Sequence, residues 1–275
     1  MPMRRTRRTL AILAFTLVSC SSPVVPASTP TTNTVALRIY ATTATIPLMR
    51  DLSERYASTH PGVTFDTITG NFQTLYDQLM RDKQGYLLTS HLPNSQPDGT
   101  PLAWPVGQDG IAIIVYPDNP ITELSSDQLR RIYLGHISKW SEIGGEDTDI
   151  IVFSREDGSG TRAEFERLLM GERLTTQSAQ LAPSSQAMVT GVAASPGSIG
   201  YVSMSYLNET IRGLAIDGVM PTPDTVYDNT YPLRSTMFIV GLEEPKDAYR
   251  EFIGWVQGTE GQEIIAQRYA PLLRP

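Results

Sequence analysis

The chain has 275 residues, 40% of them hydrophobic, and a formal net charge of −7. The length is sufficient for two compact domains, and the acidic balance argues against nucleic acid or an anionic membrane surface as a partner. Because Cys20 is the single cysteine, no internal disulfide can form.

The first twenty residues have the pattern of a secretion signal. Four arginines between residues 4 and 8 precede an apolar run, residues 10–18. This run is shorter than the about 20 apolar residues that span a bilayer. Its end, Leu-Val-Ser-Cys, resembles the lipobox of bacterial lipoproteins, in which cleavage precedes an acylated cysteine. We therefore predict a lipoprotein signal peptide over residues 1–19 and lipidation at Cys20; the alternative is an ordinary signal peptide and a chance cysteine.

Residues 20–34 are predicted to be a lipidated cysteine followed by a flexible tether. The segment is rich in Ser, Thr, Pro, Val and Ala and has no charged residue, a composition typical of extended linkers. We expect an extracytoplasmic protein held to the cell membrane through its N-terminal lipid only. Removing residues 1–19 takes away four arginines and no acidic residue, which changes the formal net charge from −7 to −11.

The rest of the chain alternates predicted strands with predicted helices. The predicted strands are residues 35–40, 63–68, 86–89, 110–116, 150–154, 198–203 and 237–240; the predicted helices are residues 47–60, 72–82, 127–135 and 163–169, with further helices within 246–269. Ser126 is the predicted N-cap of the third helix. This alternation indicates an α/β fold with mainly parallel sheets.

The loop between the strand 150–154 and the helix 163–169 has the strongest functional signal. Its sequence is Ser-Arg-Glu-Asp-Gly-Ser-Gly-Thr-Arg. Two glycines let the backbone turn tightly and approach a ligand. The amides of Gly160, Thr161 and Arg162 should lie at a helix start, where hydrogen bonding and the helix dipole both favour an anion.

Side chains of the same loop fit a tetrahedral oxyanion. Ser159 and Thr161 supply hydroxyls, and Arg155 supplies a planar fork of donors that matches phosphate geometry. The alternative is an ordinary turn, for which Asp-Gly-Ser-Gly is a common composition. The loop is not a nucleotide P-loop, because no lysine follows Gly160, and it lacks the outer glycines of a hydrolase nucleophile elbow.

A second hydroxyl-rich turn, with Thr42, Thr43 and Thr45, precedes the helix 47–60. One threonine that caps this helix would be a sufficient explanation. Turns at the carboxyl ends of strands are nevertheless where open α/β sheets bind ligands. Two such turns, one in each of two lobes, could close on a small anion from opposite sides.

These segments together resemble the phosphate-binding proteins of bacterial ABC transporters, which have a type II periplasmic-binding-protein fold. The resemblance rests on the oxyanion loop and on residues 106–115, 129–135, 137–145, 197–202, 216–222, 231–234 and 260–262. It implies two lobes with helices on both sheet faces and a ligand cleft between them: lobe I, residues 35–113 and 235–275, and lobe II, residues 114–234. It also implies a monomer that captures inorganic phosphate and delivers it to permease subunits.

The resemblance also implies a set of ligand-binding residues. They are Thr43, Thr45, the amide of Ile46, Asn71, His91, Arg155, Ser159, Gly160 and Thr161. The lobe II residues match the family without change. In lobe I, Asn71 replaces the serine of a Gly-Ser turn, Ser90-His91 replaces Ser-Asp or Ser-Arg, and Gly85 stands where the family has an aspartate.

His91 is the departure with chemical consequences. In the family's Asp form, the carboxylate accepts the phosphate proton and rejects sulfate. A histidine accepts a proton when neutral and donates one when charged, and its ordinary pKa of about 6.5 is near that of phosphate. We hypothesise that His91 replaces that discriminator, which would make selectivity weaker and pH-dependent. The alternative is that His91 points to solvent and lobe I binds through other groups.

Functions other than phosphate transport are also compatible with these residues. The protein could bind sulfate, molybdate or tungstate, or it could be a degenerate, low-affinity receptor or sensor of the same fold. An enzyme would require a nucleophile with a base, or a metal cluster. No His, Cys or carboxylate spacing typical of a metal site is present, so we expect no catalysis, no metal and no cofactor.

Overall fold

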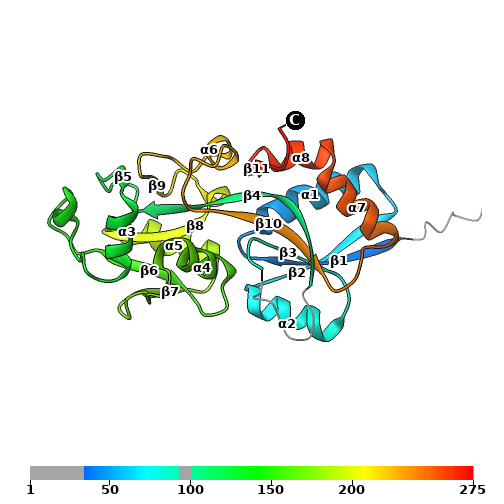
Figure 1. Ribbon diagram of the computed structural model, residues 1–275, viewed down its shortest axis with the longest axis horizontal. Coiled ribbons are helices and arrows are strands. Elements are labelled where there is room, and N and C mark those ends of the chain that lie inside the picture. The colour runs from blue at the N-terminus through cyan, green and yellow to red at the C-terminus, as the bar shows by residue number, and fades with distance from the viewer. Residues whose placement is uncertain (1–33, 93–100, 275) are drawn as a thin grey trace, which may run out of the picture. The chain divides into compact units, whose positions relative to one another are not determined.

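The computed structural model describes residues 34–92 and 101–274 (Figure 1). The strands are β1 (Val35–Thr42), β2 (Val63–Gly70), β3 (Tyr86–Thr89), β4 (Leu102–Val115), β5 (Glu123–Leu124), β6 (Ile151–Arg155), β7 (Gln180–Ala182), β8 (Ser198–Ser203), β9 (Arg212–Ile216), β10 (Arg234–Gly241) and β11 (Ala270–Pro271). The helices are α1 (Ile46–Thr59), α2 (Phe72–Asp82), α3 (Ser126–Tyr133), η1 (Trp140–Ile143), α4 (Gly160–Phe165), η2 (Glu166–Met170), α5 (Ser185–Ala194), η3 (Met204–Tyr206), α6 (Pro223–Tyr227), α7 (Asp247–Gln257) and α8 (Thr259–Ile265). The predicted signal peptide, Cys20 and the tether as far as residue 33 lie outside the described residues.

The strands form one curled sheet in the order β2-β1-β3-β10-β4-β8-β6-β7. β1 pairs in parallel with β2 and β3, and β6 pairs in parallel with β7 and β8. Every pair made by β4 or β10 is antiparallel. The sheet is therefore more mixed than the sequence predicts, because the chain crosses the molecule on two long antiparallel neighbours.

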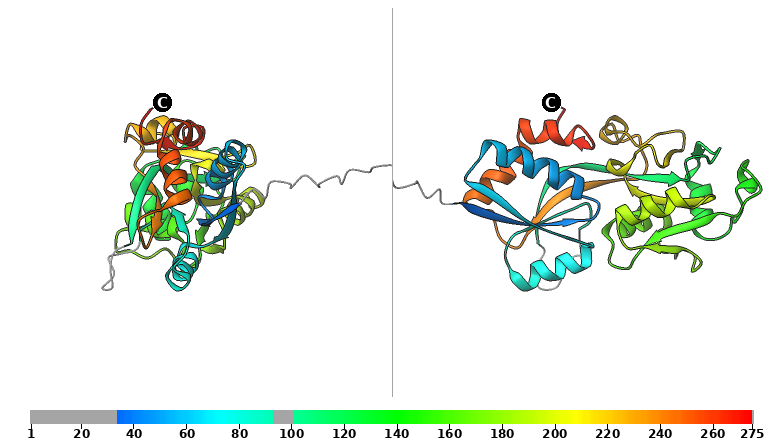
Figure 2. Two further views of the ribbon diagram at one scale, coloured as in Figure 1. Left: turned by 90° about the vertical axis from the view of Figure 1, so that its right-hand side faces the viewer. Right: turned by 180° about the vertical axis from the view of Figure 1, so that it is seen from behind.

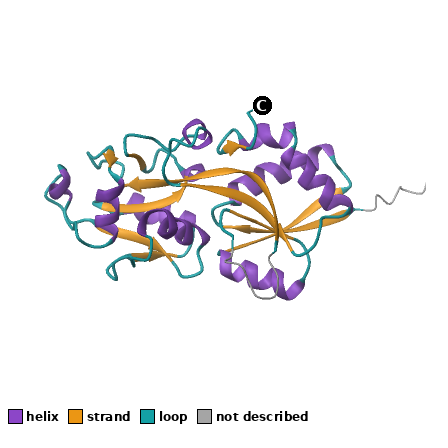
Figure 3. Ribbon diagram, viewed as in Figure 1, coloured by secondary structure: helices purple, strands orange, loops and turns teal. Residues whose placement is uncertain are grey.

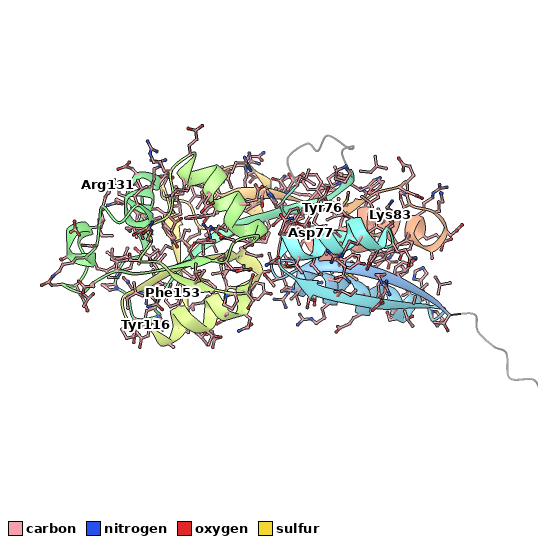
Figure 4. All side chains as sticks on the ribbon, turned by 90° about the horizontal axis from the view of Figure 1, so that it is seen from below. Tyr76, Asp77, Lys83, Tyr116, Arg131 and Phe153 are labelled. Carbon is pink, nitrogen blue, oxygen red and sulfur yellow. The ribbon has the colours of Figure 1, made fainter. Side chains whose placement is uncertain are left out.

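β4 and β10 connect two groups of elements, which are the two lobes (Figure 1). Lobe I contains β1 to β3 with α1, α2, α7 and α8, and lobe II contains β5 to β9 with α3 to α6. The predicted lobe boundaries fall inside β4 and at the first residue of β10; they remain predictions. Figure 4 shows the molecule from below. The labelled residues Tyr76 and Asp77 belong to lobe I, and Phe153, Tyr116 and Arg131 belong to lobe II.

Helices cover both faces of the lobe I strands. α1, α7 and α8 lie on one side and α2 lies on the other (Figures 1 and 2). The alternation of side chains along β1 explains this arrangement. Leu37 and Ile39 belong to the cluster that includes Leu48 of α1, whereas Tyr40 packs in a separate cluster with Leu75 of α2. Strands lying between layers of helices are also visible in Figure 3.

The elements with a strong apolar period begin and end close to the predicted residues, and α2 has the predicted bounds. The predicted N-cap of the third helix is wrong by one residue. Ser125, not Ser126, caps α3, because its hydroxyl accepts from the Gln128 amide while the Gln128 side chain accepts from the Ser125 amide. β4 begins eight residues earlier than predicted, since Pro105 and Gly107 interrupt the strand pattern of its first half.

Candidate functional site

The predicted oxyanion loop leaves the end of β6 and enters α4 at Gly160. Gly158 has a φ of +81°, a conformation that favours glycine. A Cβ on Gly158 would lie 2.8 Å from the Gln73 Cβ. The Gln73 amide donates to the Gly158 carbonyl at 3.0 Å, so the loop of lobe II is fixed directly against α2 of lobe I.

Two amides at the start of α4 are free for a ligand. Within the described part of the chain, neither the Gly160 nor the Thr161 N–H has a protein acceptor. The Arg162 amide, also expected to be free, donates instead to the Ser159 hydroxyl at 3.3 Å. Ser159 is thus the N-cap of α4, and two of the three predicted amides can face an anion.

Arg155 is 1% exposed and joins several parts of the site. Its guanidinium donates through Nη2 to Thr43 Oγ1 of lobe I at 3.1 Å and through Nε to the Ala182 carbonyl at 3.0 Å. It also forms a two-pronged pair with Glu156, both distances being 2.9 Å. An anion would therefore meet a positive charge that Glu156 already compensates in part.

Thr43 of lobe I lies directly against residues of lobe II. Besides the contact with Arg155, its hydroxyl lies 3.4 Å from the Ser185 hydroxyl at the start of α5. Its carbonyl accepts a hydrogen bond from the Tyr206 hydroxyl at 2.5 Å. The structure thus brings Thr43 and Arg155 together across the two lobes.

Thr45 and Ile46 lie at the start of α1, as the resemblance implies. The Thr45 side chain is completely buried, and its hydroxyl donates to the Leu88 carbonyl at 2.9 Å. The Thr45 hydroxyl proton is therefore engaged within the protein. The Ile46 amide has no acceptor among the described residues, and Pro47 has no N–H, so Ile46 contributes the free donor of this turn.

Asn71 caps α2 and lies beside the oxyanion loop. Its Oδ1 accepts from the Thr74 amide at 2.9 Å, which leaves the side-chain NH2 as a donor. A Cβ on Gly158 would be 3.7 Å from Nδ2 of Asn71. The replacement of a hydroxyl by an amide at this turn therefore keeps a hydrogen-bond donor close to lobe II.

His91 connects the lobes through its ring. Nδ1 lies 2.8 Å from Oε1 of Glu164 on α4, and the imidazole packs edge-on against Phe72 at a centroid distance of 4.7 Å. The side chain is 20% exposed, so the ring is held between the lobes and is not turned to solvent. Burial alone would raise the pKa of Glu164, but hydrogen bonds and charges from His91 and Arg167 outweigh it and lower that pKa.

Four residues of this candidate site were not predicted from the sequence: Glu156, Glu164, Ser185 and Tyr206. Glu156 adjoins Arg155, and its charge beside an arginine was a usable signal. Glu164 was visible only as part of a helix face, and Ser185 and Tyr206 are brought in from distant elements. Across residues 34–92 and 101–274, no group of His, Cys, Asp and Glu is arranged to hold a metal ion. In the same ranges, no helix combines the length and the apolar character required to cross a membrane.

The two lobes and their facing turns define a binding protein of the two-lobed α/β class. A family model described as a PBP superfamily domain matches residues 26–260, and the chain belongs to this superfamily. The phosphate-binding protein PstS of Bacillus subtilis is 32% identical over 171 residues, which are 59% of this chain and 55% of that protein. The chain thus spans about half the length of that relative. The PstS protein of Borreliella burgdorferi is 23% identical over 86% of this chain and 89% of its own.

Two solved structures of phosphate transport proteins are similar to this chain. A protein from Clostridium perfringens, described as a phosphate ABC transporter substrate-binding protein and solved with bound phosphate, has a TM-score of 0.81 and 27% identity. The similarity covers 87% of this chain and all of that one. An ABC-type phosphate transport receptor from Vibrio cholerae has a TM-score of 0.68 and 27% identity over 85% of this chain and 99% of its own.

Proposed function

We propose that the protein captures inorganic phosphate between its two lobes and delivers it to the permease of an ABC transporter. The observation that carries this proposal is the buried Arg155, which contacts Thr43 across the lobes beside the free amides of Gly160 and Thr161. The similarity to phosphate-binding proteins and to a structure with bound phosphate supports the choice of ligand. In this proposal the protein is a monomer without catalytic activity, anchored outside the cytoplasm through lipid on Cys20.

The proposed mechanism is binding by lobe closure. Lobe II offers Arg155 with the first amides of α4, and lobe I offers Thr43, the Ile46 amide and the Asn71 side chain. Closure expels water, so the donors act on the anion at a lower effective dielectric. Charge-assisted hydrogen bonds contribute roughly 1.5–3 kcal/mol each, which makes a micromolar or tighter dissociation constant reasonable.

The test is isothermal titration of the body, residues 35–275, with phosphate, sulfate, molybdate and tungstate. We expect phosphate to bind with micromolar or tighter affinity and more tightly than the other three anions. Absence of phosphate binding would contradict the proposal. Tight binding of a different oxyanion would instead support the second candidate.

That second candidate is a receptor for another oxyanion, or a low-affinity sensor of the same fold. Two observations in lobe I favour it: the Thr45 hydroxyl donates to Leu88, and the His91 Nδ1 is engaged by Glu164. Both contacts reduce the number of groups that lobe I can turn toward phosphate. The same titration separates the two candidates.

We further propose that His91 is a ligand-side group that sets selectivity between phosphate and sulfate. With Nδ1 engaged by Glu164, only Nε2 can reach a ligand. Replacing His91 by alanine should then change the ratio of phosphate affinity to sulfate affinity. This ratio should also differ less between pH 6 and pH 8 in the variant than in the wild type. Identical ratios for the wild type and His91→Ala at both pH values would remove His91 from the binding site.

A further inference from the structure

The crossover between the lobes contains buried polar atoms that the phosphate site does not use. Oδ1 of Asp109, Oγ of Ser235 and Oη of Tyr269 are buried and have no hydrogen-bond partner within residues 34–92 and 101–274. Asp109 on β4 and Ser235 on β10 are directly opposite in the strand register, so their side chains share one face of the sheet. Tyr269 precedes β11, whose Ala270 pairs with the neighbour of Asp109 on β4.

Unpartnered polar atoms in a protein interior are few, and a cluster of them calls for an explanation. Each of the three groups contains an oxygen that can accept a hydrogen bond. The hydroxyls of Ser235 and Tyr269 are also donors, yet neither forms a hydrogen bond with Asp109 in the described chain, so an ionised Asp109 would keep Oδ1 buried without a donor. A buried carboxylate oxygen without a donor favours the neutral acid, because burial penalises the charged form.

The surroundings of Asp109 favour the protonated form. Burial raises the pKa of this carboxyl to about 7, although hydrogen bonds from the Ser203 hydroxyl and the amides of Met204 and Gly110 oppose the rise. No lysine or arginine of the described chain is among the groups that act on it. The titratable groups that its charge affects are Tyr206 of η3, Tyr231 before β10 and Tyr269 before β11.

Tyr206 links this cluster to the anion site. Its hydroxyl donates to the Thr43 carbonyl, and the Thr43 hydroxyl accepts from Arg155. Burial raises the pKa of Tyr206 to about 12, and both Arg155 and Asp109 act on it electrostatically. Because η3 contacts β4, the strand that carries Asp109, Tyr206 connects this part of the crossover with Thr43 of the anion site, in a region where charges interact at reduced dielectric.

We propose that Asp109 is a proton-binding residue coupled to the anion site, so that capture of a dianion draws a proton onto its carboxyl. The negative charge of the anion disfavours a second negative charge on Asp109, and the neutral acid removes that repulsion. The inference rests on the proposed phosphate site. Its consequence is that affinity for the dianion decreases as the pH rises through neutrality, and that Asp109 discriminates by ligand charge without touching the ligand.

The test is calorimetry of phosphate binding near pH 7 in two buffers of different ionisation enthalpy, which counts the protons taken up. The wild type is compared with Asp109→Asn, which is nearly isosteric and always neutral. We expect the wild type to take up about half a proton more per phosphate than the variant. Between pH 6 and pH 8 its affinity should fall more than that of the variant, by up to about tenfold. Titration of phosphate itself contributes equally to both proteins.

Asp127→Asn is the matched control, since Asp127 is an exposed aspartate on α3 and this variant should behave as the wild type. If wild type and Asp109→Asn both bind phosphate and take up the same number of protons, the coupling is overturned while the phosphate site stands. If neither the wild type nor the control binds phosphate, both proposals fall. Should Asp109→Asn not fold, carboxyl NMR of the wild type decides: the pKa of Asp109 must rise on saturation with phosphate, and an unchanged value overturns the inference.

Discussion

Arg155 is the single residue on which anion binding should depend most, because it is buried and contacts both lobes. Replacing Arg155 by alanine removes the positive charge and leaves Glu156 without its partner. We expect phosphate affinity to fall about 100-fold or more, and to fall less for Ser159→Ala, which removes a neutral cap. Titration calorimetry checks both variants. Unchanged affinity in Arg155→Ala would show that the loop is not the binding site.

Arg155→Lys separates charge from geometry at the same position. Lysine keeps the charge but cannot reproduce the fork that engages Thr43, Ala182 and Glu156 together. An affinity between those of the wild type and the alanine variant is expected. Recovery of full affinity with lysine would contradict a role for the planar fork.

The contact between His91 and Glu164 leads to a prediction about pH. The pKa of Glu164 is lowered in the folded protein. A carboxyl with a lowered pKa stabilises the fold above its unfolded-state pKa, and that contribution is lost as the pH falls through the folded-state value. Glu164→Gln should therefore be less stable than the wild type by about 1–2 kcal/mol at pH 7. The gap should shrink as the pH falls toward 3. Urea denaturation at several pH values measures it, and a gap that is constant with pH would contradict the assignment.

At the scale of residues, the sequence indicates the local half of the candidate site and does not indicate the residues that distant elements bring to it. Arg155, Ser159 and Gly160 are recognisable because they lie in one turn with a distinctive composition. The contacts of Arg155 with Ser185 and of Thr43 with Tyr206 depend on how α5 and η3 pack. Nothing in the local pattern of those segments indicates a ligand site.

The turn between β6 and α4 depends on Gly158, which offers a test at the scale of elements. Gly158→Ala places an alanine at a positive φ, which alanine disfavours. It also brings the new Cβ to 2.8 Å from the Gln73 Cβ. Gly144→Ala is the matched control, because Gly144 also has a positive φ, of +91°, but a Cβ there meets nothing within 4 Å. We expect about 1 kcal/mol of lost stability in the control. The Gly158 variant should lose more stability and also bind phosphate more weakly. Equal behaviour of the two variants in denaturation and calorimetry would show that the contact with α2 does not position the turn.

A strong repeat of apolar residues made most helices and strands predictable from the sequence. Where this repeat is weak, the sequence did not predict the element. α2 repeats apolar residues on one face and ends at the predicted residue. α5 is made largely of small residues, and the first half of β4, residues 102–108, is interrupted by Pro105 and Gly107. The partners of β4 include β8, β9, β10 and β11. Pairing with these distant strands makes the first half of β4 part of the sheet. A single sequence does not reveal such long-range pairing.

At the scale of the whole molecule, β4 and β10 connect the lobes and also place Asp109 and Ser235 opposite each other in their interior. Asp109 lies within residues 106–115, one of the segments that carry the family resemblance, but no sequence pattern indicates a role for its carboxyl. Burial by residues from η3, β10 and the segment before β11 creates the unusual environment. The chemistry of Asp109 is therefore a property of the assembled fold.

Asp109 should make the stability of the whole molecule depend on pH in the opposite sense to Glu164. Its pKa is raised from 3.8 to about 7 on folding, so the folded state holds the proton more tightly than the unfolded chain. Stability is then highest at acidic pH, decreases as the pH rises through this window, and levels off above pH 7. Asp109→Asn removes the effect. Its stability relative to the wild type should be about 2–3 kcal/mol greater at pH 8 than at pH 5. Urea denaturation at the two pH values measures the difference, with Asp127→Asn as the control; an equal difference at both would mean that the carboxyl is not protonated in the folded protein near neutral pH.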